Sequence, residues 1–455
     1  MSKKMPIQVW RYCSISRLSD VFHVHFKSII ARMMVVLAMA FRLLGNREKC
    51  AKYLMASIRY GYCSSSVEMF KRYGLLNRDV LYPQVSSEVD IDEAAVRSIV
   101  IRWPTYDHNE LISKGILIIT FTKVFSYYLR NIDINELSKH FCIVLEPSWS
   151  GYFDADILSW ALETDEAVFI EAAELLDRVS LNALTSNLVP LSFGASDWVD
   201  YKSFSEQDLD VQYDSVYVAN TNHIKRVVRY VKAIKNIARK SDPHYKGCLV
   251  CASWGGKEDV IRLLPQYFNV ENNIDIRISL NKKELNEVIN SSKVNILLSY
   301  KEGSNRSLFE SMFANTPVIC IAENIGVNKS YINEYTGLLI SDRFLEDGLL
   351  YMKDNWGSYQ PKKWALENIS PEKTTKKILS ILAARDGTAD TSEVYYKTNN
   401  PEVSYLEHPG VEFSDINKKI LKAFECKSRE NNDSANNASR AIINCQQLFL
   451  SRIQK

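Results

Sequence analysis

Short apolar runs alternate with stretches of helical periodicity from residue 98 onward. Runs of this kind, separated by helices, are typical of the buried parallel strands of βαβ units. The pattern therefore predicts two α/β domains joined by an acidic polar linker near residues 197–214. The expected strands are 98–102, 115–120, 142–145, 167–171 and 188–193 in the first domain, and runs near Ser215, Cys248, Asp275, Val294, Val318 and Leu338 in the second.

The N-terminal part follows a helical pattern instead. Apolar residues recur at helical spacing over residues 26–44 and 47–60, and Gly45-Asn46 between them is typical of a turn. We therefore expect a helix hairpin, which resembles a tetratricopeptide pair but is too short to establish a repeat.

The C-terminal part is polar. Short helices are expected over residues 413–424 and 441–453, joined by a linker over 427–439 that is rich in Asn and Ser. At 455 residues the chain is too long for a single core. The predicted division is a helical extension at 1–92, α/β domains at 93–205 and 206–385, and a polar tail at 386–455.

One junction between a strand and a helix carries candidate chemistry. The apolar run 294–298 ends at Ser299, and a helical pattern follows until Pro317. Open α/β sheets bind ligands at the carboxyl ends of their strands, and the free N–H groups at a helix start favour an anion. We therefore expect a phosphate to rest on the N–H groups of Ser304, Asn305 and Arg306.

Two carboxylates lie along this junction. Glu302 precedes the helix, and Glu310 lies about two helical turns further on. A carboxylate only accepts hydrogen bonds, so each one suits a pair of sugar hydroxyls. Because glutamate is common, the pair alone favours an ordinary interpretation, in which Glu302 caps the helix and Glu310 is solvated.

The surrounding residues reverse that interpretation. The sequences S-Y-K-E-G at 299–303, E-S-M-F-A at 310–314, T-P-V-I at 316–319 and T-G-L-L at 336–339 occur in a fixed order and spacing. Over about residues 215–385 they resemble the C-terminal domain of retaining glycosyltransferases of family 4, the group 1 type. The resemblance implies a GT-B fold, in which two Rossmann-like α/β domains face each other across a cleft, here with an N-terminal helical extension.

The resemblance also assigns roles to individual residues. It implies that Glu302 contacts the donor sugar, that Glu310 binds the ribose of the nucleotide, and that Lys225 contacts the diphosphate. Gly303 to Arg306 complete the donor loop.

The chain departs from the family pattern at several positions. Asn220 replaces the usual arginine, and Arg226 replaces the usual glycine; we expect Arg226 to supply the lost charge. A basic helix start opposes the helix dipole, which an anionic ligand would explain, whereas the alternative is a solvated basic helix start. Asn305 replaces a further glycine of the motif, and Asn315 replaces a turn glycine, where Asn tolerates left-handed backbone.

The first domain carries the acceptor half in that family, so its functional residues should lie on loops after strands. Arg102 and His108 follow the first expected strand, and Glu146 and Trp149 follow the third. Trp149 is suited to stack on a sugar ring, and Glu146 to bind or activate a hydroxyl. The alternative is that Glu146 merely ends a strand while Trp149 fills a seam between the domains.

Composition limits the cofactors and the compartment. The net charge of +2 gives no argument for nucleic acid, and nine cysteines without a framework fit a reducing compartment. Cys248 and Cys251 are three apart on an expected strand, so they face opposite sides and a shared metal is not expected. We expect no metal site and no cofactor besides a UDP- or GDP-linked sugar substrate.

The first 50 residues are basic, with nine Lys or Arg and two Asp or Glu. Two interpretations remain open: a surface that binds a membrane, or a helical cap with a solvated basic face. The most apolar stretch, residues 33–41, is too short to span a bilayer, which takes about 20 residues. We expect a cytoplasmic protein, either free or peripheral on the inner face of a membrane.

The sequence thus predicts a metal-independent hexosyltransferase that moves a sugar to a glycan or lipid-linked acceptor, with retention, in surface polysaccharide biosynthesis. Two alternatives remain open. One is an inactive glycosyltransferase-like scaffold, which Asn220, Asn305 and Asn315 favour. The presence of Lys225, Glu302 and Glu310 argues against it. The other is a nucleotide-sugar epimerase, which would isomerise the donor without an acceptor.

Overall fold

The computed structural model describes residues 6–86, 88–185, 187–252, 256–386, 393–399, 403–426 and 434–454. The chain forms two compact units, which are described separately. Unit 1 comprises Met1–Lys27 and Val199–Lys373, and unit 2 comprises Ser28–Trp198 and Thr374–Lys455. The chain therefore passes from one unit to the other after Lys27, after Trp198 and after Lys373.

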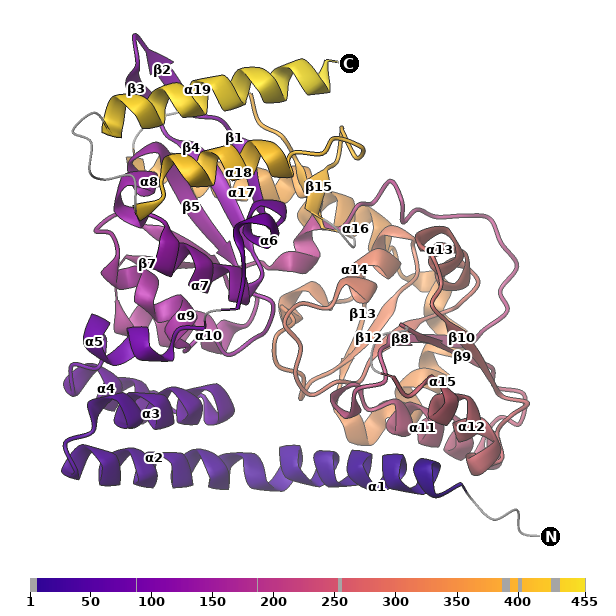
Figure 1. Ribbon diagram of the computed structural model, residues 1–455. Coiled ribbons are helices and arrows are strands. Elements are labelled where there is room, and N and C mark those ends of the chain that lie inside the picture. The colour runs from indigo at the N-terminus through magenta and orange to yellow at the C-terminus, as the bar shows by residue number, and fades with distance from the viewer. Residues whose placement is uncertain are drawn as a thin grey trace. The chain divides into compact units, whose positions relative to one another are not determined.

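Unit 1 is built on a six-stranded parallel sheet (Figure 1). Its strand order is β10-β9-β8-β11-β12-β13, which is the order of a doubly wound Rossmann fold. The strands are β8 (Ser215–Ala219), β9 (Gly247–Cys251), β10 (Ile274–Ile278), β11 (Asn295–Leu297), β12 (Val318–Ile321) and β13 (Gly337–Ile340).

Helices connect the strands of unit 1. The N-terminal helix α1 (Ile7–Val21) also belongs to this unit, because Val9 and Tyr12 are buried in its core. A single π-helical turn, Phe22–Phe26, follows α1. The other helices are α11 (Val227–Lys240), α12 (Glu258–Phe268), α13 (Lys282–Asn290), α14 (Arg306–Phe313), α15 (Leu345–Asn355) and α16 (Pro361–Asn368).

Two turns of unit 1 explain residues of the family-like motif. Asn315, which follows the C-cap of α14, has a φ of 62°, so the expected left-handed turn is confirmed. Gly337 has a φ of 153°, and a Cβ there would lie 1.9 Å from the carbonyl oxygen of Val318. Thr336 beside it is buried, and its hydroxyl donates to the carbonyl of Tyr331 at 2.6 Å. The Thr336-Gly337 pair thus allows β13 to approach β12 closely.

Unit 2 contains a five-stranded sheet of order β1-β4-β5-β6-β7. β4, β5, β6 and β7 are parallel, whereas β1 pairs with β4 antiparallel. A hairpin of β2 and β3 lies between β1 and β4 in the sequence. The strands are β1 (Ser98–Arg102), β2 (Thr105–Asp107), β3 (Glu110–Ser113), β4 (Gly115–Thr120), β5 (Phe141–Glu146), β6 (Val168–Glu171) and β7 (Leu188–Leu191).

Helices from both ends of the sequence complete unit 2. The N-terminal ones are α2 (Lys27–Leu43), α3 (Arg47–Gly61), α4 (Ser64–Arg72), α5 (Arg78–Leu81) and α6 (Ile91–Val96). α7 (Thr122–Asn131), α8 (Ile134–His140), α9 (Ala155–Leu158) and α10 (Leu175–Leu184) follow the sheet strands. The tail adds α17 (Pro371–Asp386), the hairpin β14 (Lys397–Asn399) and β15 (Val403–Tyr405), α18 (Ser414–Ala423) and α19 (Ser434–Ile453).

The expected fold class, α/β with two Rossmann-like sheets and an N-terminal helical extension, is confirmed. All the expected strands are present, and so is the helix hairpin, in which Asn46 caps α3. The linker expected over residues 427–439 is partly wrong, because residues 434–439 belong to α19. Residues 427–433 lie outside the described residues.

The compact units also differ from the expected consecutive domains, since α1 packs with unit 1 and the tail packs with unit 2. Apolar side chains buried in both units are responsible: Val9 joins the core of unit 1, and Phe449 joins the core of unit 2.

Candidate functional site

The candidate site lies where the strand order of unit 1 reverses. β8 and β11 are neighbours in the sheet, but the chain continues from them in opposite directions. The loops that follow such a pair form the ligand crevice of an open α/β sheet. Here they are residues 220–226, called the 220–226 loop below, and residues 298–305, which lead into α14.

These two loops bring Lys225 and Glu302 together. The Nζ atom of Lys225 lies 2.6 Å from both carboxylate oxygens of Glu302. The two side chains are 14% and 5% exposed, so the ion pair is largely shielded from water. The hydroxyl of Ser299 donates to Oε1 of the same carboxylate. Two of the residues expected at the donor site are therefore in direct contact.

The loop after β12 braces the backbone of Glu302. The N–H of Glu302 donates to the carbonyl of Ile325 at 2.8 Å, and Nδ2 of Asn324 donates to the carbonyl of Ser299 at 2.7 Å. Gly326 has a φ of 115°, and a Cβ there would lie 1.9 Å from the carbonyl oxygen of Glu302. The sequence reasoning missed this contribution, although glycine after a strand is a signal for such a close approach.

The start of α14 corrects the ordinary interpretation of the two glutamates. Asn305 is the N-cap, because its Oδ1 accepts from the N–H of Leu308 at 3.2 Å and from the hydroxyl of Ser307 at 2.9 Å. Glu302 therefore does not cap the helix. Glu310 lies within α14 and is 5% exposed, so it is not a solvated surface residue. Gly303 and Ser304 lie between the ion pair and the helix start.

Arg226 has a different place from the one expected. Its guanidinium donates from Nε to Asp20 at 2.8 Å, from Nη2 to Asp342 at 2.8 Å, and from Nη1 to the carbonyl of Leu298 at 3.1 Å. It also lies 4.0 Å from the ring centre of Tyr300. The expectation that Arg226 supplies charge to a ligand is therefore corrected: these internal partners already engage its donor groups.

The backbone of Arg226 explains the departure from the family pattern. Its φ is 55°, in the left-handed region that favours glycine. Burial opposes the ionisation of Asp342, but its hydrogen bonds and ion pairs with Arg226 and Arg229 lower its pKa nonetheless. Arg226 can therefore occupy a position that favours glycine, because the ion pairs of its guanidinium with Asp20 and Asp342 stabilise the left-handed backbone.

Asn220 shapes the loop. It is buried, and its Oδ1 accepts from the N–H of Asn222 at 2.9 Å. The Oδ1 of Asn222 in turn accepts from the N–H of Ile224 at 3.1 Å. These bonds form successive local turns that lead to Lys225.

A second cation, Lys257, lies beside the same loop. Its Nζ is 3.2 Å from Nε2 of His223. Burial, and then the charge of Lys257, lower the pKa of His223 to about 4, so the imidazole is neutral at pH 7. An ammonium can only donate, so Nε2 accepts and the proton lies on Nδ1. The sequence reasoning missed Lys257, although it follows β9 at the same edge of the sheet.

In unit 2, the direction of β1 corrects two expected acceptor residues. Because β1 is antiparallel to β4, its last residue lies beside the first residues of β4, away from the carboxyl edge of the parallel strands. Arg102 is buried there and donates to the carbonyl of Lys114 at 2.9 Å. His108 lies at the tip of the β2–β3 hairpin, and its side chain is 96% exposed. Neither residue is at the edge where an acceptor was expected.

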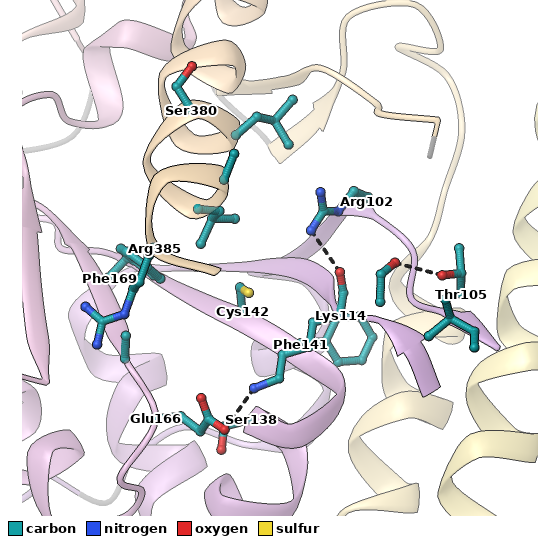
Figure 2. A pocket seen from close by; sticks show the side chains of 16 residues that line it. Arg102, Thr105, Lys114, Ser138, Phe141, Cys142, Glu166, Phe169, Ser380 and Arg385 are labelled. Carbon is teal, nitrogen blue, oxygen red and sulfur yellow. Dashed lines mark hydrogen bonds and ion pairs between the residues drawn. The ribbon is translucent and has the colours of Figure 1, made fainter. Parts of the chain in front are cut away.

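Arg102 instead lines a cavity of about 740 Å³ at the amino ends of the parallel strands. Figure 2 shows Arg102, Lys114, Glu166 and Arg385 around it. Lys114 forms an ion pair with Glu166 at 3.0 Å. The cavity lies at the edge of the sheet opposite to the one that binds ligands in doubly wound folds.

The carboxyl edge of unit 2 holds the other two expected residues. Trp149 is 51% exposed on the loop after β5. The hydroxyl of Ser148 accepts from the N–H of Thr122 at 3.2 Å, so the loops after β4 and β5 adjoin. Glu146 is the last residue of β5 and is buried.

A lysine from the tail contacts Glu146. The Nζ of Lys397 in β14 is fully buried, lies 2.6 Å from Oε2 of Glu146, and lies 4.9 Å from the ring centre of Trp198. The indole of Trp198 donates to Oε1 of Glu171 at 2.9 Å. Burial, followed by the charge of Glu146, raises the pKa of Glu171 well above its usual value. An acceptor role for Glu146 stays a prediction, and any such ligand would meet an existing ion pair.

The described residues offer neither a cluster of metal ligands nor a helix that could span a membrane. Among the described residues, no group of three or more His, Cys, Asp or Glu side chains is arranged to hold a metal ion. Cys248 and Cys251 belong to different hydrophobic clusters, which confirms that they face opposite sides of β9. Within the same described ranges, no helix has the length and apolar character needed to cross a bilayer.

Residues 202–352 match the family model of Glycosyl transferases group 1. This segment includes β8 to β13 and both residues of the ion pair, but it is less than half of the chain. No curated protein sequence gives a significant match to the chain.

Several solved structures are similar in part. The pneumococcal O-GlcNAc transferase GtfA, in complex with UDP and GlcNAc, shares 14% identity with a TM-score of 0.45, over 59% of this chain and 57% of that one. Sucrose-phosphate synthase from Thermosynechococcus elongatus shares 14% identity with a TM-score of 0.46, over 60% of this chain and 74% of that one. HepE of Anabaena, with UDP and glucose, shares 11% identity with a TM-score of 0.45, over 59% and 78% of the two chains. The match with GtfA thus spans little more than half of its length.

Proposed function

We propose that the protein transfers a sugar from a UDP- or GDP-linked donor to a glycan or lipid-linked acceptor, with retention of configuration and without a metal. The observation that carries the proposal is the contact between Lys225 and Glu302 at the strand-order reversal, inside the segment that matches the group 1 family. An ammonium there can stabilise a departing diphosphate without a metal ion.

The donor would lie along the two loops of unit 1. Lys225 and the N–H groups at the start of α14 would bind the diphosphate, since a helix N-terminus favours an anion. Glu302 would accept from the sugar hydroxyls, and Glu310 from the ribose. The hydroxyl of the acceptor would come from the carboxyl-edge loops of unit 2, where Trp149 offers an exposed aromatic face.

The first test is nucleotide binding. Thermal unfolding of the full chain is measured with UDP, GDP, ADP and CMP, because a ligand that binds only the folded state raises the melting temperature. We expect a shift with UDP or GDP that Lys225→Met reduces and Glu310→Ala removes. Glu334→Ala, at an exposed glutamate of the same unit, is the matched control. If none of these nucleotides shifts the wild-type melting temperature, the scaffold alternative replaces the proposal.

A second test separates transfer from isomerisation. The wild type is incubated with each sugar nucleotide that stabilises it, and the products are followed by NMR. Release of the nucleoside diphosphate with an α-linked product from an α-linked donor supports a retaining transferase. An epimerised sugar that remains attached to its nucleotide supports the epimerase instead.

The proposal includes a peripheral position on the inner face of a membrane, in surface polysaccharide biosynthesis. The outer face of α2 supports it. Ile29, Met33, Val36 and Leu43 are exposed, and their spacing places them on one side of the helix. Ala31 and Ala38 lie on the opposite side and are buried. A helix whose exposed side is apolar suits an interface between water and lipid.

The positive charge around this face favours binding to an anionic lipid surface. Residues 21–47 contain Lys27, Arg32, Arg42 and Arg47 but no Asp or Glu. The test is flotation with vesicles of phosphatidylcholine, alone or mixed with phosphatidylglycerol. We expect binding to the mixed vesicles only, and a loss of about tenfold in Val36→Glu. Val96→Glu, at an exposed valine of α6, is the control. Equal binding of both variants, or no binding by the wild type, would remove the membrane from the proposal.

A further inference from the structure

Helix α1 contacts the 220–226 loop through one row of side chains. Tyr12, Ser16 and Asp20 are four residues apart, so they lie on the same face of the helix. The hydroxyl of Tyr12 donates to the carbonyl of Thr221 at 2.9 Å. Tyr12 thus provides the first contact of this row with the 220–226 loop. The sequence alone did not indicate this row.

The next two members of the row contact His223 and Arg226, which lie two residues before and one residue after Lys225. The Oγ atom of Ser16 lies 2.8 Å from Nδ1 of His223 and accepts a hydrogen bond from the Nδ1–H group, since Nε2 already accepts from Lys257. The carboxylate of Asp20 accepts from Nε of Arg226 at 2.8 Å. The backbone of Lys225 is therefore anchored on both sides by α1.

The geometry of the loop depends on such anchors. Arg226 has a left-handed φ of 55°, which is unfavourable for any residue with a Cβ and persists only where the surroundings impose it. The hydroxyl of Tyr217 donates to the carbonyl of Lys225 from the strand below. α1 contacts the same loop as well, and the ring centre of its Tyr12 lies 4.5 Å from that of His223.

We propose that α1 supports the nucleotide site from outside it, and that Tyr12, Ser16 and Asp20 are positioning residues that hold Lys225 where it meets the diphosphate. The inference rests on the proposed donor role of Lys225. It explains why an N-terminal helix packs with unit 1, although the residues that follow Lys27 pack with unit 2. The row acts through Lys225 and does not itself contact the donor.

The test is a double-mutant cycle in the full chain. Affinity for UDP and for GDP is measured by calorimetry in the wild type, in Ser16→Ala/Asp20→Asn, in Lys225→Met and in the triple variant. We expect the α1 substitutions to weaken binding about tenfold when Lys225 is present and to have no further effect when it is absent. Ser14→Ala, on the same helix, is the matched control and should bind as the wild type does.

The outcomes separate this inference from the proposed function. If the wild type binds neither nucleotide, the donor site itself is refuted. If the wild type binds and the α1 substitutions have no effect, or weaken binding equally with and without Lys225, only the positioning role is refuted.

Hydrogen exchange provides a readout that needs no nucleotide. We expect Asp20→Asn to speed amide exchange in the 220–226 loop while β8 keeps its protection. Unchanged exchange in the loop would overturn the inference, because α1 would then not hold it.

Discussion

The ammonium of Lys225 and the carboxylate of Glu302 compensate each other's charge, at 2.6 Å from Nζ to either oxygen. An anion that binds Lys225 must therefore compete with Glu302. This relationship gives Glu302 an effect on nucleotide affinity that is opposite in sign to its expected effect on transfer.

We expect Glu302→Gln to bind UDP or GDP about tenfold more tightly, which is about 1.4 kcal/mol, because the ammonium loses its competing charge. Sugar transfer should fall, since the amide is a poorer acceptor for the sugar hydroxyls. Calorimetry and product release measure the two effects, with Glu334→Gln as control. Weaker nucleotide binding in Glu302→Gln would mean that the carboxylate mainly maintains the loop.

Gly326→Ala should distort the loop that contains Glu302, because Gly326 packs against the backbone of Glu302. A Cβ at this position overlaps the carbonyl of Glu302, and the φ of 115° is unfavourable for alanine. We expect a loss of about 2–4 kcal/mol in the free energy of unfolding of unit 1, together with weaker nucleotide binding. Denaturant titration measures the loss. Gly357→Ala is the matched control, because no atom lies within 4 Å of its Cβ position; an equal loss there would contradict the argument.

The buried ion pair of unit 2 should be important for stability. Lys397→Met leaves the carboxylate of Glu146 buried without its cation, and breaking such a pair costs about 3–5 kcal/mol. Lys418→Met, which removes an exposed partner of Asp92, should cost less than about 1 kcal/mol. Unfolding midpoints of the two variants are compared. Similar midpoints would show that water or another group replaces Lys397.

Glu171 makes stability depend on pH. Burial, and then Glu146, raise its pKa in the folded state, so the folded protein holds a proton that the unfolded chain releases above about pH 4.5. Stability is therefore lost as the pH rises from that value toward the folded pKa. Glu171→Gln cannot ionise, so its advantage over the wild type in the free energy of unfolding should grow between pH 5 and pH 8. A difference independent of pH would show that Glu171 ionises normally.

The strands of the two main sheets could be predicted because most of them are buried apolar runs separated by helical stretches. The hairpin strands β2 and β3 were not expected, because they are short and partly exposed. The direction of β1 could not be predicted, because an apolar run has the same appearance in parallel and antiparallel pairing. That single reversal moves Arg102 to the opposite edge of the sheet. The beginning of α19 was missed because an Asn- and Ser-rich stretch can be helical when later residues pack.

The local part of the candidate site was predictable, since Glu302 and Glu310 lie within one strand-to-helix junction. Its long-range part was not. Asp20 meets Arg226 and Lys397 meets Glu146 across hundreds of residues, and no local pattern marks either pair. Ion pairs of this kind depend on which helix or hairpin packs on which unit, which the sequence reasoning had assigned differently.

The packing of α1 on unit 1 also has a consequence for biosynthesis. Tyr12 and its partner Thr221 are 209 residues apart. At the usual rate of translation, roughly 5–20 residues per second, α1 leaves the ribosome about 10–40 seconds before the loop that it contacts has been made. During that interval Val9 and Tyr12 have no binding site on their own chain. Unit 1 can therefore finish folding only after most of the chain has been synthesised.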